Sequence, residues 1–227
     1  MGNVCCVIQA RMGSSRLPGK VMRVVAGRPI LAHVVERVQQ CKGVTEVIVA
    51  TTNLPEDEII MRWCEEHQVK VLGLTKKLAN GQNDVLARFG LAAQLATNDI
   101  LMRVTADCAL WCPILGAEVV EAYLTGKFQY VSNVHPWCDG FDTEVFSRAA
   151  LEEADTQAVS DYDRMHVTPY MRLHAVCGYV DHLSLLVNAK LSIDTREDFD
   201  RAVAILERVQ DFSWQETMRV AQGVQQS

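Results

Sequence analysis

The sequence predicts an α/β protein built on one mostly parallel sheet with helices on both faces. Strand-like apolar runs alternate with helical segments over the first 132 of its 227 residues, and this alternation is typical of parallel strands joined by helical crossovers. Apolar residues make up 49% of the chain and charged residues 22%, as in folded globular proteins. Because the sequence shows no linker, repeat or low-complexity segment, we expect residues 1–227 to form one domain.

Each expected element has its own signal, since short apolar runs predict strands and apolar stripes at helical spacing predict helices. The strands are expected at Val4–Gln9, Glu46–Ala50, Val69–Leu72, Ile100–Thr105 and Phe128–Ser132. The first helix is expected to start at Pro29. The later helices are expected at Pro55–His67, Asp84–Ala96, Pro113–Leu124 and Thr195–Val209. Proline fits the first turn of a helix, and the acidic start of the second helix suits the helix dipole.

The regular alternation ends near residue 133. Residues 133–146 mix turn residues with a short strand pattern, and residues 155–175 are polar. Two strand-like runs follow, at Val176–Val180 and Leu183–Val187. We therefore divide the domain into a regular nucleotide-binding core (about 1–132), an elaborated region (about 133–187) and a C-terminal part with a candidate metal-binding aspartate and helices (188–227). The elaborated region is expected to carry acceptor specificity and a subunit contact.

Composition excludes several classes of protein. The net charge of −6 gives no electrostatic support for nucleic-acid binding. No apolar run approaches the roughly 18 residues that span a bilayer, and no signal-peptide pattern is present, so we expect a cytoplasmic protein without a membrane partner. The eight cysteines include no C-x-x-C pair, and the spacing of Cys108 and Cys112 is a weak metal signal. We expect reduced, mostly buried thiols.

The stretch VIQARMGSSRLPGKV, residues 7–21, carries the strongest functional signal. Loops at the carboxyl ends of parallel strands are where open α/β sheets bind ligands. Gly13, Ser14 and Ser15 offer backbone N–H groups and hydroxyls, while the loop's three basic side chains supply charge for several phosphates. Those side chains are Arg11, Arg16 and Lys20. The stretch therefore predicts a triphosphate site, and the alternative is a basic surface turn.

Two familiar phosphate motifs do not fit this loop. A Walker A loop has four residues between its glycines and a Ser or Thr after its lysine. Here five residues separate Gly13 from Gly19, and Val21 follows Lys20. The Rossmann G-x-G-x-x-G pattern is absent.

The loop resembles the A-R-x-G-S-x-R-L-P-G-K signature of the cytidylyltransferases that make CMP-activated acid sugars, such as CMP-Kdo and CMP-sialic acid synthetases. The closest similarity is to the spore coat polysaccharide biosynthesis protein F branch. Later blocks match in order: NDVLARFGLAA, RVTADCALWCP, YVSNVHP, GFDTEVFSRAALEEA, DRMHVTPYM and LSIDTREDF. The resemblance implies a nucleotide-diphospho-sugar transferase-like fold, CTP and a small acidic sugar as substrates, and a homodimer.

The resemblance also implies roles for individual residues. Lys20, Arg11 and Asp107 are the expected catalytic residues, with Lys20 at the α-phosphate. Cytosine is expected near Ala10 and the Ala50–Thr51–Thr52 turn, although the two threonines could simply end a strand. The implied nucleotide-binding set is Ala10, Arg11, Gly13, Ser14, Ser15, Arg16, Lys20, Ala50, Thr51, Thr52 and Arg103.

Asp107 and Asp194 are the candidate ligands for Mg²⁺. Each follows a strand-like run, so the two carboxylates can converge at one edge of the sheet, and Mg²⁺ bound to phosphates needs only one or two carboxylates. The alternative is that each caps the segment that follows it. Arg103 lies inside an apolar strand, where a buried guanidinium requires a phosphate or carboxylate partner.

The acceptor site is expected in the later blocks. Its candidate residues are Asn133, Asp142, Glu144, Arg164 and His166. His166 could orient a hydroxyl or act as a base, and the alternative is a structural histidine. Arg164 is the candidate clamp for an acceptor carboxylate, although it could instead pair with Asp161 or Asp163. Two departures from the family pattern lie near these blocks: Cys112 replaces a second aspartate, and Gly140–Glu144 reads GFDTE instead of GLDVE.

Two other functional classes compete with the cytidylyltransferase prediction. A glycosyltransferase would use an Asp-x-Asp motif after a strand, and Asp161–Asp163 fits the letters but no strand precedes it. A non-catalytic nucleotide-binding module would not need both aspartates. The expected activity remains magnesium-assisted attack of an acceptor hydroxyl on CTP, for surface polysaccharide or glycan biosynthesis.

Overall fold

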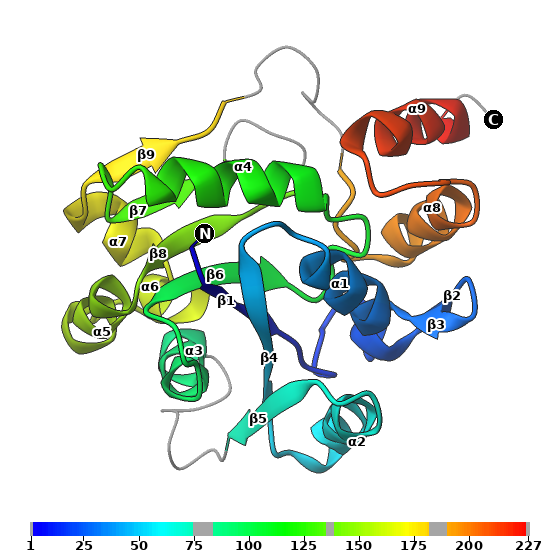
Figure 1. Cartoon of the computed structure of the whole chain (residues 1–227). Coiled ribbons are helices and arrows are strands. Elements are labelled where there is room, and N and C mark those ends of the chain that lie inside the picture. Colours follow the sequence, from blue (N-terminus) through cyan, green and yellow to red (C-terminus); the bar gives the residue numbers. More distant parts are fainter. Residues whose placement is uncertain (1, 75–83, 135–138, 182–189, 226–227) are drawn as a thin grey trace.

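A seven-stranded sheet forms the centre of the molecule (Figure 1). The computed structural model describes residues 2–74, 84–134, 139–181 and 190–225. The strand order is β5-β4-β1-β6-β8-β7-β9, and β8 is the strand that runs antiparallel to its neighbours β6 and β7. The strands are β1 (Val4–Gln9), β4 (Val44–Thr52), β5 (Lys70–Leu74), β6 (Ile100–Thr105), β7 (Tyr130–Ser132), β8 (Glu144–Ser147) and β9 (Cys177–Tyr179). The predicted mostly parallel sheet is confirmed.

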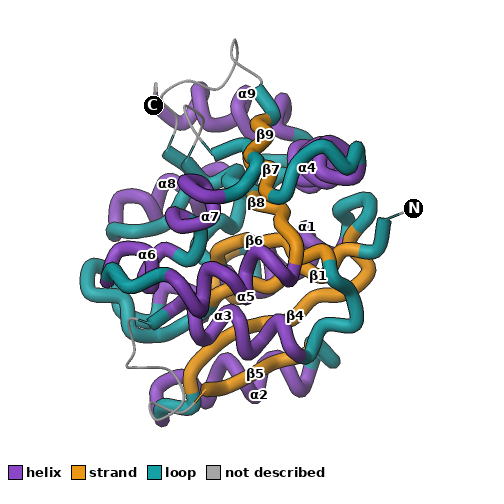
Figure 2. Tube along the Cα trace, turned by 90° about the vertical axis from the view of Figure 1, so that its left-hand side faces the viewer, coloured by secondary structure: helices purple, strands orange, loops and turns teal. Residues whose placement is uncertain are grey.

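Helices cover both faces of this sheet, as the sequence predicts. One face packs against α1 (Ile30–Gln39), α2 (Glu58–Glu66) and α4 (Pro113–Leu124). The other packs against α3 (Val85–Gln94), α5 (Arg148–Gln157) and α7 (Pro169–His174); α3 and α5 lie across it in Figure 2. Alternate residues of β1 serve the two cores, because successive side chains of a strand point to opposite faces.

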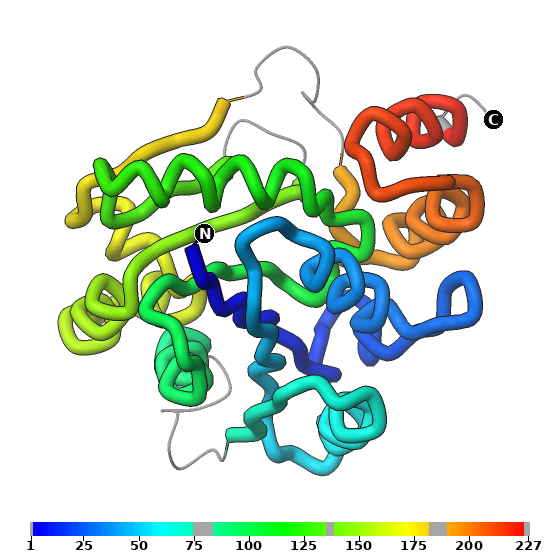
Figure 3. Tube along the Cα trace, in the orientation of Figure 1, coloured from blue at the N-terminus to red at the C-terminus, as the bar shows by residue number. Residues whose placement is uncertain are grey.

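A third apolar cluster joins the C-terminal helices to the core. Helices α8 (Arg196–Leu206) and α9 (Trp214–Gln225) pack near the start of α1 and the chain after β6 (Figure 3). A short hairpin, β2 (Val24–Val25) and β3 (Arg28–Pro29), leads into α1. This packing brings the segment before α8 to the edge of the sheet where β1 and β6 end.

The parallel register determines where the predicted loop lies. Gln9, the last residue of β1, pairs with Ala50 of β4 and with Thr105 of β6. The loops that follow these three strands therefore leave the same edge of the sheet. Because that edge is the carboxyl edge, it is the usual ligand site of such folds.

The elaborated region contains more helix than its polar sequence suggested. Helix α5, helix α6 (Asp161–His166) and helix α7 occupy most of residues 148–174. Ser147 and Ser160 begin α5 and α6 by accepting hydrogen bonds from Ala150 N and Asp163 N. Such serine caps satisfy N–H groups that otherwise lack partners. The predicted run Val176–Val180 forms β9, while Leu183–Val187 lies outside the described residues.

None of the helices in the described ranges is both long and apolar enough to cross a bilayer. The seven cysteines of these ranges are all unpaired thiols, and six of them are buried. Burial raises the pKa of Cys5, Cys41 and Cys64 to about 12, so these thiols stay protonated at neutral pH.

Candidate nucleotide site at the carboxyl edge of the sheet

The loop after β1 folds back on itself. The carbonyl oxygen of Met12 accepts hydrogen bonds from Ser14 N (2.8 Å) and Gly19 N (2.9 Å). Gly19 has φ of +69°, a conformation that favours glycine, and the 3₁₀ turn Lys20–Met22 starts directly after it. Gly13 is exposed, and a Cβ atom placed on it would meet no other atom within 4 Å, so a ligand can approach its backbone closely.

Asp57 anchors this loop to the neighbouring strand. Its Oδ1 accepts a hydrogen bond from Met12 N at 2.6 Å, and its Oδ2 accepts one from the hydroxyl of Thr52 at the end of β4. Only 1% of Asp57 is exposed. Nothing in the sequence indicates this role, because an acidic residue in a first helical turn is adequately explained by the helix dipole.

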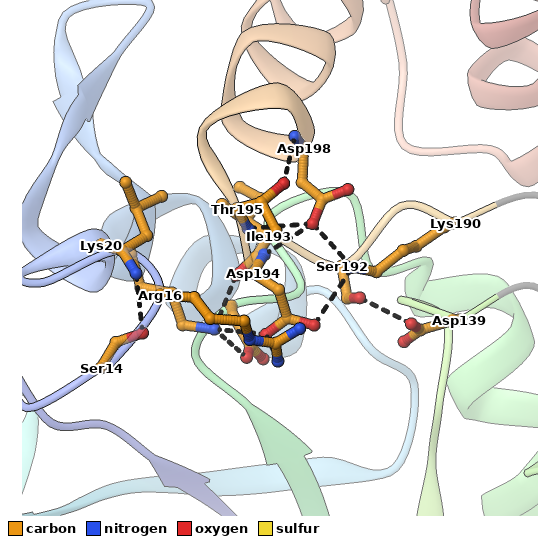
Figure 4. Close-up of polar contacts among 12 residues, drawn as sticks. Ser14, Arg16, Lys20, Asp139, Lys190, Ser192, Ile193, Asp194, Thr195 and Asp198 are labelled. Carbon is orange, nitrogen blue, oxygen red and sulfur yellow. Dashed lines mark hydrogen bonds and ion pairs between the residues drawn. The ribbon is translucent and has the colours of Figure 1, made fainter.

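Lys20 binds both candidate metal ligands. Its Nζ donates to Asp107 Oδ2 (2.7 Å), Asp194 Oδ1 (3.0 Å) and the carbonyl oxygen of Ile193 (2.6 Å). These contacts use all three ammonium hydrogens. Lys20 and Arg16 both extend toward Asp194 in Figure 4, and Arg16 Nη2 lies 3.0 Å from Asp194 Oδ1. The predicted convergence of the two aspartates is therefore observed.

The charges of this cluster stabilise one another. Burial alone would lower the pKa of Lys20, but Asp107 and Asp194 outweigh it and raise that pKa above its ordinary value. Burial would raise the pKa of Asp194, but Lys20 and Lys190 reverse this effect and lower it. Lys20 and Asp194 are consequently both charged at neutral pH.

Helix α8 does not use Asp194 as its cap. Thr195 is the N-cap residue of a capping box: its Oγ1 accepts from Asp198 N, and the Asp198 carboxylate accepts from Thr195 N. The carboxylate of Asp198 also accepts from Asp194 N (3.1 Å) and Lys190 Nζ (2.6 Å). This arrangement fixes the backbone of Asp194 and leaves its carboxylate facing Lys20 (Figure 4).

A cleft of about 310 Å³ opens beside this cluster, within the size range of small-ligand sites. Of the predicted residues, its lining includes Ala10, Arg11, Ser14, Ser15, Arg16, Lys20, Arg103, Asp107, His166 and Asp194. Ala50, Thr51 and Thr52 are instead buried at the end of β4: the Ala50 carbonyl accepts from Ala10 N, and Thr52 bonds Asp57. Ala50 and Thr52 therefore hold the loop in place and do not line the cleft.

Arg103 has the carboxylate partner that its place in an apolar strand predicted. Its Nη1 donates to Glu144 on the adjacent β8, and its Nε donates to Gln9 Oε1 at 2.6 Å. Glu144 also accepts from Tyr130 Oη (2.6 Å) and Thr168 Oγ1 (2.5 Å). Burial would raise the pKa of Glu144, but Arg103 and these hydroxyls lower it. Glu144 is therefore a buried, charged carboxylate in the sheet that accepts hydrogen bonds from Arg103, Tyr130 and Thr168.

Of the acceptor candidates His166 and Arg164, only His166 lines the cleft. Arg164 instead forms ion pairs with Asp84 (2.9 Å) and Asp155 (2.7 Å). Neither Asp161 nor Asp163 is its partner, because α6 packs on α3 and places Arg164 beside the α3 N-cap residue Asp84. A carboxylate clamp at Arg164 would have to displace both ion pairs.

Asn133 directly follows β7, and Asp142 lies two residues before β8. The amide of Asn133 donates to the Phe141 carbonyl (3.0 Å) and accepts from Thr143 N (2.7 Å), so it links the end of β7 to the residues that precede β8. Burial and the negative charges of Asp139 and Glu144 raise the pKa of Asp142 to about 7. Asp142 is therefore the acceptor candidate whose charge changes near neutral pH.

The Asp161–Asp163 motif does not meet the requirements of a glycosyltransferase metal site. It lies on helix α6, where Asp163 N and its carboxylate bond the capping Ser160. Within the described ranges, no group of three or more histidine, cysteine or acidic side chains gathers around a possible metal position.

A sequence model of the cytidylyltransferase family matches residues 5–223. The chain belongs to the cytidylyltransferase family. It is 36% identical over 198 residues to an uncharacterized protein of Methanocaldococcus jannaschii, covering 85% of this chain and 79% of the relative. It is 27% identical over 219 residues to the spore coat polysaccharide biosynthesis protein SpsF of Bacillus subtilis, and the match covers 92% of this chain and 88% of SpsF. An 8-amino-3,8-dideoxy-manno-octulosonate cytidylyltransferase of Shewanella loihica is 29% identical over 194 residues, covering 75% of each chain.

Solved structures of the family share this fold. A cytidylyltransferase from Leptospira borgpetersenii superposes with a TM-score of 0.88 at 26% identity, covering 100% of this chain and 96% of that one. A CMP:2-keto-3-deoxy-manno-octonic acid synthetase complexed with CTP superposes with a TM-score of 0.69 at 17% identity. The match covers 91% of this chain and 99% of that one. Family and fold together make this cytidylyltransferase chain a nucleotidyltransferase, which removes the glycosyltransferase and non-catalytic alternatives.

Proposed function

We propose that this cytidylyltransferase transfers the cytidylyl group of CTP to a hydroxyl of a small acidic sugar, giving a CMP-sugar and pyrophosphate. The observation that carries the proposal is the position of Lys20, held between Asp107 and Asp194 at the floor of the cleft. The names of two relatives, a CMP-sugar-type cytidylyltransferase and SpsF, support the substrate class and a role in surface polysaccharide biosynthesis.

In this reaction, the acceptor oxygen forms a bond to the α-phosphorus of CTP. The bond from that phosphorus to the oxygen that bridges the α- and β-phosphates breaks. Pyrophosphate leaves with that oxygen, and the proton of the acceptor hydroxyl is released to water. Such transfers depend on positioning and charge stabilisation more than on a covalent protein group. We assign Lys20 to the α-phosphate and Arg11, Ser14 and Arg16 to the phosphate chain, because all four line the cleft.

Asp107 and Asp194 fit the requirements of a Mg²⁺ site. One oxygen of each lies within 3.0 Å of the same Lys20 nitrogen, so the two carboxylates are close enough to share one small cation. Two carboxylates suffice when substrate phosphates complete the coordination. When bound, Mg²⁺ would neutralise phosphate charge at this edge of the cleft. Lys20 would then donate to the α-phosphate in place of the aspartates.

The proposed acceptor is an unphosphorylated keto-sugar acid. The cations of the loop already serve the triphosphate, and Arg164 is paired with Asp84 and Asp155, so a sugar phosphate dianion has little charge left to bind. Among the acceptor candidates, His166 lines the cleft. Burial and the charges of Arg103 and Arg172 lower the pKa of His166, which keeps it neutral and able to bond an acceptor hydroxyl at pH 7.

A homodimer is also part of the proposal. The strand β9 lies at the edge of the sheet, and the elaborated region around it exposes apolar side chains. These are Val159, Leu173, Val176 and Tyr179. Several exposed apolar side chains in one region are typical of an interaction surface, and this is the region where the sequence predicted a subunit contact.

The test is a substrate panel. The purified protein is incubated with Mg²⁺, each of the four nucleoside triphosphates and matched sugar acids or sugar 1-phosphates, and pyrophosphate release is measured. We expect release with CTP and an acid, and a CMP-sugar by mass spectrometry. A CDP-sugar would contradict the acceptor assignment alone, whereas turnover of another triphosphate in preference to CTP would contradict the proposed activity.

A further inference from the structure

Arg88 is a buried arginine in the lining of the same cleft, although its spacing from Asp84 predicts only an ion pair along one helix. It lies in the first turns of α3, where only 4% of it is exposed. Its Nε is buried and has no hydrogen-bond partner among the residues that the structure describes. An unsatisfied buried donor on a guanidinium is costly, so its placement in a ligand cleft requires an explanation.

The charged groups around Arg88 do not explain why its guanidinium is buried in the cleft. Burial and the nearby Arg11 lower the pKa of Arg88 to about 10, while Asp57 and Asp84 oppose this shift. Both carboxylates are already used by other groups. Asp57 accepts from Met12 N and Thr52, and Asp84 accepts from Ala87 N and both Nε and Nη2 of Arg164. Arg88 thus lines the cleft beside a second guanidinium, and the carboxylates nearest to it serve other donors.

We propose that Arg88, together with Arg11, binds the distal phosphates of the nucleotide, the pair that leaves as pyrophosphate. This inference rests on the proposed function. A neutral cytosine ring can accept a hydrogen bond, but it cannot offset the repulsion between two guanidiniums, whereas a phosphate does both. Arg88 is well placed for this role because its neighbours Val85, Leu86 and Phe89 fix α3 against the sheet.

Three ligands separate this role from its alternatives: CTP, CMP and inorganic pyrophosphate, each titrated calorimetrically in the presence of Mg²⁺. For Arg88→Met we expect CTP and pyrophosphate to bind about 10- to 100-fold more weakly, the range for hydrogen bonds to charged groups. CMP should bind within twofold of wild type. An equal loss for CMP would place Arg88 at the base or α-phosphate, and unchanged CTP and pyrophosphate would exclude any phosphate role; either result overturns the inference.

Arg37 provides the matched control. It is also buried, and burial lowers its pKa to about 10 as well, but it lies on α1 and donates to the Trp111 carbonyl at 3.1 Å. Arg37→Lys should reduce the melting temperature while all three affinities stay within twofold of wild type. If Arg88→Met does not fold, Arg88→Lys is compared with Arg37→Lys, because lysine keeps the charge and loses the guanidinium fork. Pyrophosphate binding within twofold of wild type in Arg88→Lys would then overturn the inference.

These measurements distinguish a failure of the Arg88 inference from a failure of the proposed cytidylyl transfer. If CTP is turned over but Arg88 variants bind pyrophosphate normally, the inference fails and the activity stands. If no triphosphate is turned over but pyrophosphate binding still depends on Arg88, the activity fails and the anion subsite stands. If wild type binds neither CTP nor pyrophosphate, both are wrong.

Discussion

Replacing Lys20 with alanine separates the catalytic role of this residue from its structural one. Lys20 is 9% exposed and makes three contacts of 2.6–3.0 Å through its ammonium group. In the proposed reaction it meets charge that develops at the α-phosphate. Removing one such contact typically costs about 3 kcal/mol at the transition state, or about a hundredfold in rate.

The stability cost should be smaller than that of a fully buried pair. The side chains of Asp107 and Asp194 are 25% and 23% exposed, so water can solvate them once the ammonium is gone. We expect a loss of about 1–2 kcal/mol in unfolding free energy, below the 3–5 kcal/mol of a fully buried broken pair. Pyrophosphate release gives the rate, and chemical denaturation gives the stability.

Lys42 supplies the control, since its ion pair with Glu121 is on the surface and its side chain is 74% exposed. Lys42→Ala should leave the rate unchanged and the stability within about 0.5 kcal/mol. Activity of Lys20→Ala within threefold of wild type would refute the assignment of Lys20. So would a parallel loss of activity in Lys42→Ala, because it would show that the assay responds to any lost lysine.

Four further predictions test other parts of the molecule. Asp107→Asn and Asp194→Asn should each raise the Mg²⁺ concentration for half-maximal activity about tenfold, and turnover in excess chelator would contradict the site. Because burial raises the pKa of Asp142 to about 7, its proton stays on the folded protein after the unfolded chain has lost it; unfolding free energy should therefore fall from about pH 4 to pH 7, and Asp142→Asn should remove that slope in denaturant titrations. Leu173→Glu, at a side chain that is 79% exposed, should convert the proposed homodimer to a monomer in light scattering, and a monomeric wild type at micromolar concentration would disprove the proposed homodimer. Thr143→Val should cost about 1–3 kcal/mol in denaturation while pyrophosphate release stays within twofold; an unchanged stability would show that its hydrogen bond contributes little.

The features that the sequence predicted correctly depend on local pattern. Runs of buried residues identify β1 and β6 because both faces of these strands are covered, and a proline in the first turn marks the start of α4. The convergence of Asp107 and Asp194 was predicted from strand ends, but only Asp107 lies just beyond a strand, β6. Residues 191–194 form no strand. Ile193 N donates to the Asp107 carbonyl (3.0 Å), and this backbone contact brings together residues that are 87 positions apart in the sequence.

The features that the sequence missed depend on contacts between distant segments. The partner of Arg164 is Asp84, 80 residues away, and the loop anchor Asp57 is 45 residues from Met12. No local rule distinguishes these acids from ordinary surface or capping residues. Arg88 could not be predicted for the same reason, because an i, i+4 relation to Asp84 on one helix is a complete local explanation.

The departures from the family pattern have a packing explanation, which the sequence alone did not reveal. Cys112 is 1% exposed and lies in the cluster with α8 and α9, so it faces the core and does not alter the Lys20 cluster. Trp111, beside it, is fully buried, and its indole Nε1 donates to Thr143 Oγ1 at 3.0 Å.

A buried indole N–H needs an acceptor, and Thr143 supplies one where the usual pattern has valine. The change at position 143 is therefore coupled to Trp111 and not to Cys112. A tryptophan at position 111 makes a hydroxyl at position 143 favourable, and neither Cys112 nor Thr143 lines the cleft. The altered motifs consequently carry information about the packing of the core, and the acceptor has to be inferred from residues that reach the cleft, such as His166.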